Sequence, residues 1–563
     1  MKKGEIYTGK VVDLKFPNKG MVEYSDENGV VHVCVKGVFP GQTVSYRLTR
    51  KKNSNFEGQL IEVVERAPYE VQSDCPHYPL CGGCAYRTIP YEKQLEIKEN
   101  QVRKLLENYL THDVVFEGIK KSPIYNEYRN KMEFSFGDCV KDGPLELGLH
   151  KSGSFYDIIS VKNCRIADAD MRAILSETLS YFRGKDTKYY HKRTHEGFLR
   201  HLLIRKAVRT GEILVDIVTT SQTPPDGMCT EISLMQDWKE AILGLKLTGK
   251  IVGVLHTVND SVADSIINEK TDILYGQDYF LENILGLTFK ITPFSFFQTN
   301  SLSAEVLYST ARDFIVDAVG EDGLHNNTVF DLYSGTGTIA QIIAPVTKRV
   351  IGIEIVEEAV VAARMNAELN GLHNCEFVAG DVLKMLDEIE EKPGFIILDP
   401  PRDGINPKAL KKIMDYGVEN IVYISCKPTS LARDLEMFTL GGYKVKRVCC
   451  VDQFPMTPHV ETVCLLSKLH EAKHHVSVKL DMDEMDLTSA ESKATYEEIK
   501  KYVAEHNDGM KVSSLNIAQV KAKYGIIERE NFNKPKSEEA KQSQCSKEKE
   551  DAIVEAVKAF QMI

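Results

Sequence analysis

Two kinds of hydrophobic pattern occur along the chain. Within residues 1–66, short apolar runs with partial alternation occupy 6–14, 30–35 and 43–48. Short strands at this spacing predict a small OB-like β-barrel. From Phe294 onwards, apolar strands are instead followed by glycine-rich turns and helical segments, an order that predicts a parallel α/β sheet.

The middle of the chain mixes strand and helix patterns. An amphipathic helix is expected over 94–110. The runs 199–205 and 213–218 predict a strand pair that is joined by a turn at Gly211. We therefore expect a central α+β domain between the barrel and the parallel sheet.

Beyond residue 470 the apolar positions return at helical spacing in three segments, 494–505, 512–520 and 551–560. The charged stretch 534–549 has few apolar residues and is expected to be mobile. The chain is thus expected to contain a barrel, a central domain, an α/β domain and a helical extension of unknown role. Their predicted ranges are 1–66, 67–292, 293–469 and 470–563.

The composition is that of a globular protein. Of the 563 residues, 43% are hydrophobic and 27% are charged, and neither a secretory signal nor an apolar run of membrane-spanning length is visible. We therefore expect a cytoplasmic protein that acts as a monomer. The net charge of −11 disfavours RNA binding over the whole surface, yet residues 1–66 hold eleven Lys and Arg against eight Asp and Glu.

Basic and aromatic residues are interspersed in the predicted barrel, the aromatic ones including Phe16 and Tyr46. The basic residues are Lys10, Lys15, Lys19, Arg47, Arg50, Lys51 and Lys52. Such a mixture suits a groove for single-stranded RNA, although an ordinary solvated barrel surface would carry the same residues. The pattern resembles the TRAM domain, an RNA-binding barrel that is attached to several RNA-modifying enzymes.

Three of the thirteen cysteines lie in one short segment that is rich in proline and glycine. They are Cys75, Cys81 and Cys84, in C-x5-C-x2-C spacing. The three thiols can converge on one centre, for which Cys164 is the nearest plausible fourth ligand, and such a set fits structural zinc or an iron–sulfur cluster. In the zinc case His77 could replace Cys164. Cys139 is a further candidate, although core packing accounts for it equally well.

Carboxylates stand at the ends of successive predicted strands in the α/β part. They are Asp331, Glu354, Asp381 and Asp399. Ligands of open α/β sheets bind at the carboxyl ends of the strands, and an acid about 20 residues after the first strand is placed to bind ribose hydroxyls. Gly335 and Gly337 let a ligand approach the backbone, but the third glycine of the dinucleotide fingerprint is missing. The pattern favours S-adenosylmethionine over NAD.

A lone cysteine, Cys426, follows the apolar run 422–425 where a polar turn begins. At the carboxyl end of a strand it is a candidate nucleophile. For an isolated cysteine, an inert buried thiol would be the better explanation.

These segments together resemble the RNA uracil-5-methyltransferases, in particular the 23S ribosomal RNA branch that carries an iron–sulfur cluster. The resemblance covers roughly residues 1–468. The motifs that carry it are Phe297-Gln298-Thr299-Asn300, Asp331 to Gly337, Asp399-Pro400-Pro401-Arg402, Ser425-Cys426-Lys427-Pro428 with Ala432-Arg433-Asp434, and Pro458-His459-Val460-Glu461-Thr462-Val463. The family often has Asn at position 427, and the lysine found there is expected to lower the pKa of the neighbouring thiol.

The resemblance implies a class I, Rossmann-like methyltransferase domain. Cys426 is implied to add to C6 of uracil, and Glu461 to remove the C5 proton, for which partial burial would raise its pKa towards a useful value. The residues implied to line the S-adenosylmethionine site are Gln298, Tyr333, Glu354 and Asp399, with Asp381 near the adenine. The residues implied to hold a 4Fe–4S cluster are Cys75, Cys81, Cys84 and Cys164. A base that reacts in such a pocket must leave its stack, so single-stranded or loop RNA is the expected partner.

Three other functions share some of these features. A transfer-RNA uracil-5-methyltransferase would use the same catalytic residues, but the barrel and the cysteine segment favour the ribosomal branch. A cytosine-5-methyltransferase would also use a cysteine nucleophile, yet it lacks the Pro-His-x-Glu-Thr signature. A non-catalytic RNA-binding assembly factor would not need both Cys426 and Glu461.

Overall fold

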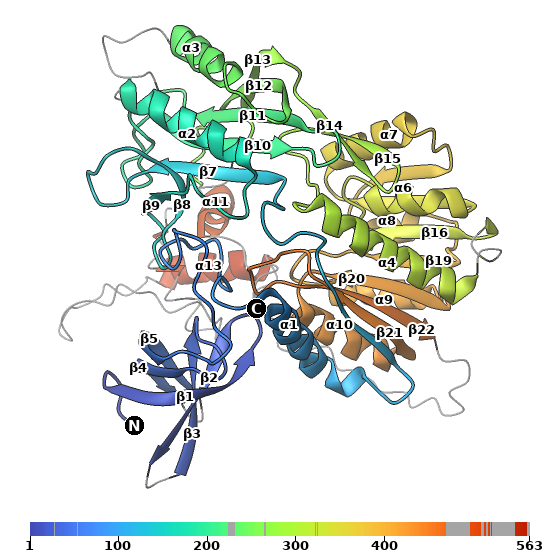
Figure 1. Cartoon of the computed structure of the whole chain (residues 1–563). Coiled ribbons are helices and arrows are strands. Elements are labelled where there is room, and N and C mark those ends of the chain that lie inside the picture. The colour runs from blue at the N-terminus through green and yellow to red at the C-terminus, as the bar shows by residue number, and fades with distance from the viewer. Residues whose placement is uncertain are drawn as a thin grey trace. The chain divides into compact units, whose positions relative to one another are not determined.

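The computed structural model in Figure 1 contains two compact units, Met1–Ala472 and Lys473–Ile563. It describes residues 1–26, 29–52, 55–185, 187–222, 231–263, 266–320, 323, 325–468, 496–507, 510, 512–513, 516–517, 520 and 547–559. None of the helices within these ranges combines the length and the apolar character that a membrane span needs.

The N-terminal part is a closed barrel with the strand order β1-β2-β3-β5-β4. Its strands are β1 (Ile6–Lys15), β2 (Lys19–Asp26), β3 (Gly29–Lys36), β4 (Thr43–Lys52) and β5 (Asn55–Glu65). The predicted barrel is therefore confirmed. Tyr46, however, lies on the inward face of β4 with Val44 and Leu48, two residues away on either side, and all three are wholly buried. The prediction that Tyr46 belongs to an RNA groove is wrong for this reason.

A seven-stranded sheet with the order β13-β12-β11-β10-β7-β8-β9 forms the central part. Its strands are β7 (Lys131–Gly137), β8 (Glu146–His150), β9 (Ile158–Ser160), β10 (Leu199–Lys206), β11 (Glu212–Thr219), β12 (Lys250–Val258) and β13 (Lys270–Gly276). β10 and β11 pair antiparallel, with Lys206 opposite Ile213, which confirms the predicted strand pair. The helices α2 (Ala169–Gly184) and α3 (Glu231–Leu243) lie beside this sheet (Figure 1). Their side chains Phe182 and Trp238 are buried in one core with the sheet.

The α/β part is an eight-stranded sheet with the order β18-β17-β16-β19-β20-β22-β21-β6. Its strands are β16 (Thr328–Leu332), β17 (Arg349–Glu354), β18 (Cys375–Ala379), β19 (Phe395–Leu398), β20 (Asn420–Ser425), β21 (Tyr443–Val451), β22 (Glu461–Lys468) and β6 (Val115–Lys120). The five strands from β16 to β20 pair with parallel neighbours, as the strand–turn–helix order predicted. β6 lies in the range 67–292 that was predicted as the central domain, yet it pairs with β21 of this sheet. The predicted domain limits therefore stay a prediction.

Helices cover both faces of this sheet because its strands are apolar on both sides. One face carries α4 (Ser301–Val319), α6 (Thr338–Ile343) and α7 (Glu357–Leu369). The other carries α1 (Tyr91–Leu105), α8 (Val382–Glu388), α9 (Pro407–Asp415) and α10 (Pro428–Leu440). Short 3-10 turns follow α1 and α6, η1 (Glu107–Tyr109) and η2 (Ala344–Val346).

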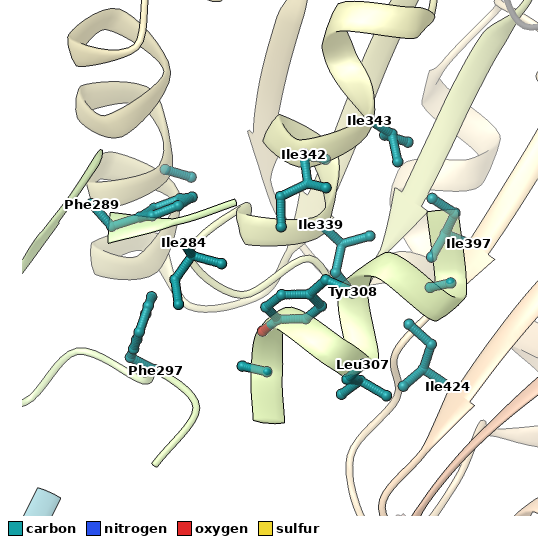
Figure 2. Close-up of a cluster of buried hydrophobic side chains, with 14 of the residues drawn as sticks. Ile284, Phe289, Phe297, Leu307, Tyr308, Ile339, Ile342, Ile343, Ile397 and Ile424 are labelled. Atoms are coloured by element: carbon teal, nitrogen blue, oxygen red, sulfur yellow. The ribbon is translucent and has the colours of Figure 1, made fainter. Parts of the chain in front are cut away.

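A hairpin of β14 (Phe280–Ile284) and β15 (Leu287–Ile291) adds to the first of these faces. Figure 2 shows this core, in which Tyr308 of α4 lies among Ile284 of the hairpin, Ile339 of α6 and Leu307. The segment with Gln298 lies between the hairpin and α4, so this core anchors it beside the eight-stranded sheet.

The second unit has a small core of its own, to which Ile499, Val503 and Ile553 contribute. It contains α11 (Tyr496–His506) and α13 (Lys547–Ala559), close to two of the predicted helices. Much of the predicted helix 512–520, and residues 534–546 of the predicted mobile stretch, lie outside the described residues. Residues 547–549 of that stretch begin α13, where acidic residues in the first turn suit a helix N-terminus.

Candidate active site

The order of the parallel strands reverses between β16 and β19. The chain runs from β16 to β17 and β18 on one side, and from β19 to β20 on the other. Ligands of open α/β sheets bind at such a switch point, beyond the carboxyl ends of the strands. Asp331 lies near the end of β16, and Asp399 directly follows β19, with the backbone N–H of Asp399 donating to the Leu332 carbonyl over 3.3 Å. The structure thus brings these two predicted site residues together.

The glycine-rich turn after β16 is bound to the end of β17. Tyr333 has a φ of 66°, a left-handed conformation that a bulky residue rarely adopts and that often marks functional sites. Oε2 of Glu354 accepts a hydrogen bond from the N–H of Gly335 over 2.9 Å. A Cβ atom at Gly337 would lie 2.4 Å from the ring of Phe377, so only glycine fits there. Two predicted ligand-binding residues, Tyr333 and Glu354, therefore flank this turn.

Gln298 lies in a buried polar network. Its backbone carbonyl accepts from the Asn130 side-chain amide over 2.8 Å, and its Oε1 accepts from Nε2 of Gln453 over 3.4 Å. The hydroxyl of Tyr308 also hydrogen-bonds to Gln298, and burial holds the pKa of Tyr308 well above its usual range. Because Oε1 of Gln453 is buried with no hydrogen-bond partner, this network retains an acceptor to offer to a ligand.

Asp381 has a structural role of its own. Its side chain accepts from the backbone N–H of Lys384 over 3.3 Å and so caps the N-terminus of α8. It is exposed at the end of β18, the third acid in the row that the sequence predicted.

Cys426 and Glu461 come together through strand pairing. β20 and β22 are antiparallel, and Ser425 lies opposite Thr462. Cys426 is the residue after Ser425, and Glu461 is the residue before Thr462, so the two neighbours face each other at the same end of the sheet. Cys426 is half-buried, whereas Glu461 is only 3% exposed. The nucleophile and the base expected from the sequence therefore share one site.

Three buried carboxyls of this site, those of Asp331, Asp399 and Glu461, have raised pKa values. Burial, and next the charge of Asp399, raise the pKa of Glu461 to about 8. The same two causes raise the pKa of Asp331 to about 8, and burial raises the pKa of Asp399 to about 7. The predicted rise for Glu461 is thus confirmed. Strongly perturbed pKa values that gather at one edge of a sheet are typical of a functional site.

The thiol of Cys426 does not have the lowered pKa that the sequence suggested. Burial, and next the carboxyls of Glu461 and Asp399, raise its pKa to about 11. The cation that opposes this rise is Arg402, which also lowers the pKa of Glu461. Lys427 instead faces Asp403, with 3.7 Å between Nζ and Oδ1. The expectation for Lys427 is wrong because its side chain points to another partner.

The sequence indicated no separate role for Asp434, although this residue ends the motif Ala432-Arg433-Asp434 that contributes to the family resemblance. Oδ2 of Asp434 accepts from the N–H of Ile405 over 2.9 Å and from the hydroxyl of Tyr423 over 2.7 Å. Its neighbour Arg433 donates to Oδ1 and to the carbonyl of Asp403. Asp434, only 2% exposed, therefore joins the loop that carries Arg402 to the strand that carries Cys426.

The loop that leads into Glu461 is held by α1. Nζ of Lys98 donates to Oδ1 of Asp452 over 2.6 Å, and both side chains are wholly buried. The side chain of Gln94 binds Met456, which has a φ of 66°. Breaking a buried ion pair leaves an uncompensated charge, so this contact fixes the approach to the base. The sequence offered no signal for it, because Lys98 and Asp452 are 354 positions apart.

The segment with Cys75, Cys81 and Cys84 forms one wall of a cavity. All three thiols line this cavity together with Cys164. His77 lines it too, but its Nε2 accepts from the backbone N–H of Asn163 over 3.2 Å, which occupies one of its two ring nitrogens. Cys139 is not among the lining residues.

The cavity also contains a buried cation. Arg87 lines it with a side chain that is 1% exposed, and this side chain hydrogen-bonds to Cys84, where it opposes the rise in the pKa of the thiol that burial causes. In the described part of the chain, no three His, Cys, Asp or Glu side chains are arranged to share one metal ion. Four thiols spread around one cavity therefore fit a metal cluster, in which each thiolate binds a different metal atom, better than a single zinc ion, which needs its ligands about 2.3 Å away.

Comparisons with known proteins agree with this geometry. A family model described as tRNA (Uracil-5-)-methyltransferase matches residues 90–469. An uncharacterized RNA methyltransferase of Clostridium tetani (strain Massachusetts / E88) is 48% identical over 463 residues, which are 82% of this chain and 98% of the relative. Another, of Caldanaerobacter subterraneus subsp. tengcongensis, is 48% identical over 468 residues, which are 83% of this chain and 100% of the relative.

Among solved structures, the Pyrococcus abyssi tRNA (uracil-54, C5)-methyltransferase in complex with S-adenosyl-L-homocysteine matches with a TM-score of 0.62 and 24% identity. The match covers 82% of this chain and 100% of that one, and confirms the predicted fold class. The predicted enzyme class, an S-adenosylmethionine-dependent RNA uracil-5-methyltransferase, is confirmed by the family match. This chain belongs to the RNA uracil-5-methyltransferase family.

Proposed function

We propose that this protein methylates C5 of a uridine in 23S ribosomal RNA, through a covalent bond between Cys426 and C6 of the uracil. The observation that carries the proposal is the register of β20 and β22, which sets Cys426 beside Glu461 at the switch-point edge of the sheet. The barrel and the cysteine cavity support the ribosomal branch, since the resemblance to that branch includes both.

In the first step the thiolate of Cys426 adds to C6, because C5 of uracil alone is a poor nucleophile. A bond forms between Sγ and C6, and the displaced electron pair makes an enolate that is nucleophilic at C5. S-adenosylmethionine supplies an electrophilic methyl group, which C5 takes as the carbon–sulfonium bond breaks. Arg402 favours the thiolate, since its charge opposes the rise in the pKa of Cys426 that burial and the nearby carboxyls cause.

In the second step the proton on C5 passes to the carboxylate of Glu461. The electron pair left on C5 restores the C5–C6 double bond and expels the thiolate of Cys426. Burial makes Glu461 a stronger base than an exposed carboxylate, while Arg402 keeps its ionised form accessible. The two residues therefore act at different stages of one reaction.

The methyl donor is proposed to lie across the switch point. Glu354 would accept from its ribose, since each carboxylate oxygen that binds a backbone N–H retains a free lone pair. Tyr333 and Gln298 would line the same place, and Asp399 would face the sulfonium and amine side. Asp381 would lie near the adenine, beyond the end of β18.

We also propose that Cys75, Cys81, Cys84 and Cys164 hold a 4Fe–4S cluster. In such a cluster each thiolate binds its own iron, so the four sulfurs need not converge on one point. The buried guanidinium of Arg87, which hydrogen-bonds to Cys84, would offset the negative charge of the thiolates. Anaerobically purified protein should contain iron and sulfide in similar amounts, and Cys139→Ser should leave both unchanged. Stoichiometric zinc without sulfide would contradict this assignment.

The substrate is tested by methyl transfer from labelled S-adenosylmethionine to total RNA, followed by separation of the RNA classes and detection of 5-methyluridine. We expect the label in 23S ribosomal RNA with wild-type protein and none with Cys426→Ala. Transfer RNA is the alternative substrate, because the family description and the Pyrococcus abyssi structure both name it. Label in transfer RNA alone would replace the ribosomal assignment, and label in neither would contradict the function.

A further inference from the structure

Two consecutive aromatic residues project from the loop that joins β8 to β9. Phe155 is 59% exposed and Tyr156 is 45% exposed, although single exposed apolar residues are more usual than adjacent aromatic ones. The rings meet edge to face at 5.3 Å between centroids, and His150 at the end of β8 stacks on Phe155 at 6.0 Å. The loop therefore presents rigid aromatic faces rather than a flexible tip.

A second segment places a cation against each of these rings. Nζ of Lys192 lies 4.5 Å from the ring centroid of Phe155, and Cζ of Arg193 lies 4.3 Å from that of Tyr156. Both cations sit at the tip of a tight hairpin in which His191 and Glu196 pair, with an N–H to carbonyl distance of 2.7 Å. The hairpin precedes β10, so the topology, rather than sequence proximity, brings the rings and the cations together.

The charge of this surface suits a polyanion. The two segments, 150–157 and 188–196, contain four Lys and Arg against two Asp and Glu, together with three histidines, in a protein whose net charge is −11. One of the acids, Asp157, pairs with Lys151 over 3.6 Å, and Asp138 nearby hydrogen-bonds to Tyr189. Each of these two carboxylates thus has a polar partner of its own, while the cations of Lys192 and Arg193 lie over the two rings.

The aromatic loop is supported by the cysteine segment. The N–H of Gly82 donates to the His150 carbonyl over 3.0 Å, and the N–H of Ser152 donates to the Leu80 carbonyl over 2.7 Å. Cys81 and Lys151 form an antiparallel bridge between these bonds. Any group that orders the cysteine segment therefore also orders the base of the aromatic loop.

We propose that Phe155, Tyr156, Lys192 and Arg193 form a platform that binds a single-stranded segment of the substrate RNA. This segment adjoins the RNA loop that contains the target uridine. Bases stack on the exposed rings while phosphates pair with the two cations, the combination that sequence-tolerant single-strand sites use. This platform deepens the proposed function, since it adds a contact for the RNA that the catalytic site modifies.

The test measures RNA binding directly, so that it does not depend on methyl transfer. Wild-type protein, the double variant Phe155→Ala/Tyr156→Ala and the double variant Lys192→Gln/Arg193→Gln are titrated with a uridine dodecamer, with 23S ribosomal RNA fragments and with transfer RNA. The matched control is Tyr275→Ala, because Tyr275 is 42% exposed on β13 at the opposite edge of the same sheet. Melting temperatures establish that each variant is folded.

We expect the aromatic variant to raise the Kd for the dodecamer roughly 5- to 150-fold per lost base stack. The cationic variant should also weaken binding and reduce the slope of log K against log salt by about 0.7 for each lost phosphate contact. Affinity for S-adenosylmethionine and the Kd of Tyr275→Ala should stay unchanged. Unchanged RNA affinity in both double variants, or an equal loss in Tyr275→Ala, would overturn the platform.

The outcome is separable from that of the proposed function. If the protein methylates transfer RNA and not ribosomal RNA, the two double variants should still lose affinity for the dodecamer. A dodecamer that carries 4-thiouridine should in addition crosslink to peptides from 150–157 or 188–196. Crosslinks confined to other segments would count against the platform even where ribosomal RNA is methylated.

Discussion

The acidic cluster should make binding of the methyl donor depend on pH. The pKa values of Asp331, Asp399 and Glu461 are raised to about 8, 7 and 8, so these groups largely hold protons in the ligand-free protein at pH 6. S-adenosylmethionine carries one net positive charge, whereas S-adenosylhomocysteine carries none. A cationic ligand favours the ionised carboxylates, so the donor should bind more tightly as the pH rises through these values.

The magnitude follows from the pKa values. If Asp399 alone must ionise, a pKa of about 7 implies a roughly 10-fold gain in affinity between pH 6 and pH 8. If Glu461 alone must ionise, a pKa of about 8 implies a gain of roughly 50-fold over the same range. S-adenosylhomocysteine should show a smaller gain, because it lacks the sulfonium charge.

Isothermal titration calorimetry at pH 6, 7 and 8, in two buffers of different ionisation enthalpy, measures both the affinity and the protons released. We expect about one proton to leave on binding of S-adenosylmethionine near pH 7, and fewer with S-adenosylhomocysteine. Asp399→Asn should flatten the dependence, since it removes one titrating group and lowers the pKa of Asp331 and Glu461. Equal pH dependence for the two ligands, without proton release, would refute the reasoning.

Three further predictions concern other parts of the protein. Replacing Lys10, Lys19 and Arg47 by Gln should reduce the salt slope of RNA binding by about 0.7 per lost contact, and an unchanged slope would place the barrel's phosphate contacts elsewhere. Asp434→Ala should lower the free energy of unfolding by about 2–4 kcal/mol, because it leaves the buried donors of Ile405 and Tyr423 unpaired. A loss below about 0.5 kcal/mol in urea titrations would contradict a structural role for these hydrogen bonds. Burial raises the pKa of Asp216 to about 8, so wild-type stability should fall as pH rises from 4 to 8. Thermal melts should show that the free energy of unfolding of Asp216→Asn, relative to wild type, increases by about 1.4 kcal/mol per pH unit in that window. A difference that stays constant with pH would contradict the raised pKa of Asp216.

Local pattern was enough to predict the parallel sheet and its row of acids. A buried parallel strand is apolar on both faces, so the runs that end at Asp331 and Asp399 stand out from their polar turns. Carboxyl ends of parallel strands share one edge, which is why acids far apart in sequence could be placed together. The barrel was predictable from the spacing of its short strands, although their alternation was too weak to show that Tyr46 faces inwards.

The contacts that depend on tertiary structure could not be predicted. Which cation faces Cys426 depends on the path of two loops, and the nearer residue in sequence, Lys427, faces another carboxylate. The buried pair of Lys98 and Asp452 joins segments that no local pattern connects. The pairing of β6 with β21 was also not predictable from local pattern. β6 precedes the strands of the seven-stranded sheet in sequence, yet it pairs with the last part of the eight-stranded sheet.

The central claim is that Cys426 acts first and Glu461 afterwards at one uracil. Glu461→Gln should add the thiol to C6 and accept the methyl group, and then stall because the C5 proton cannot leave. The stalled species is a protein–RNA adduct that survives denaturing electrophoresis and forms only with S-adenosylmethionine present.

The decisive measurement compares this adduct in Glu461→Gln, in Cys426→Ala and in the variant that carries both changes. We expect the adduct with Glu461→Gln alone, while Cys426→Ala still binds both substrates. Normal turnover by Glu461→Gln, or an adduct that persists without Cys426, would contradict the account.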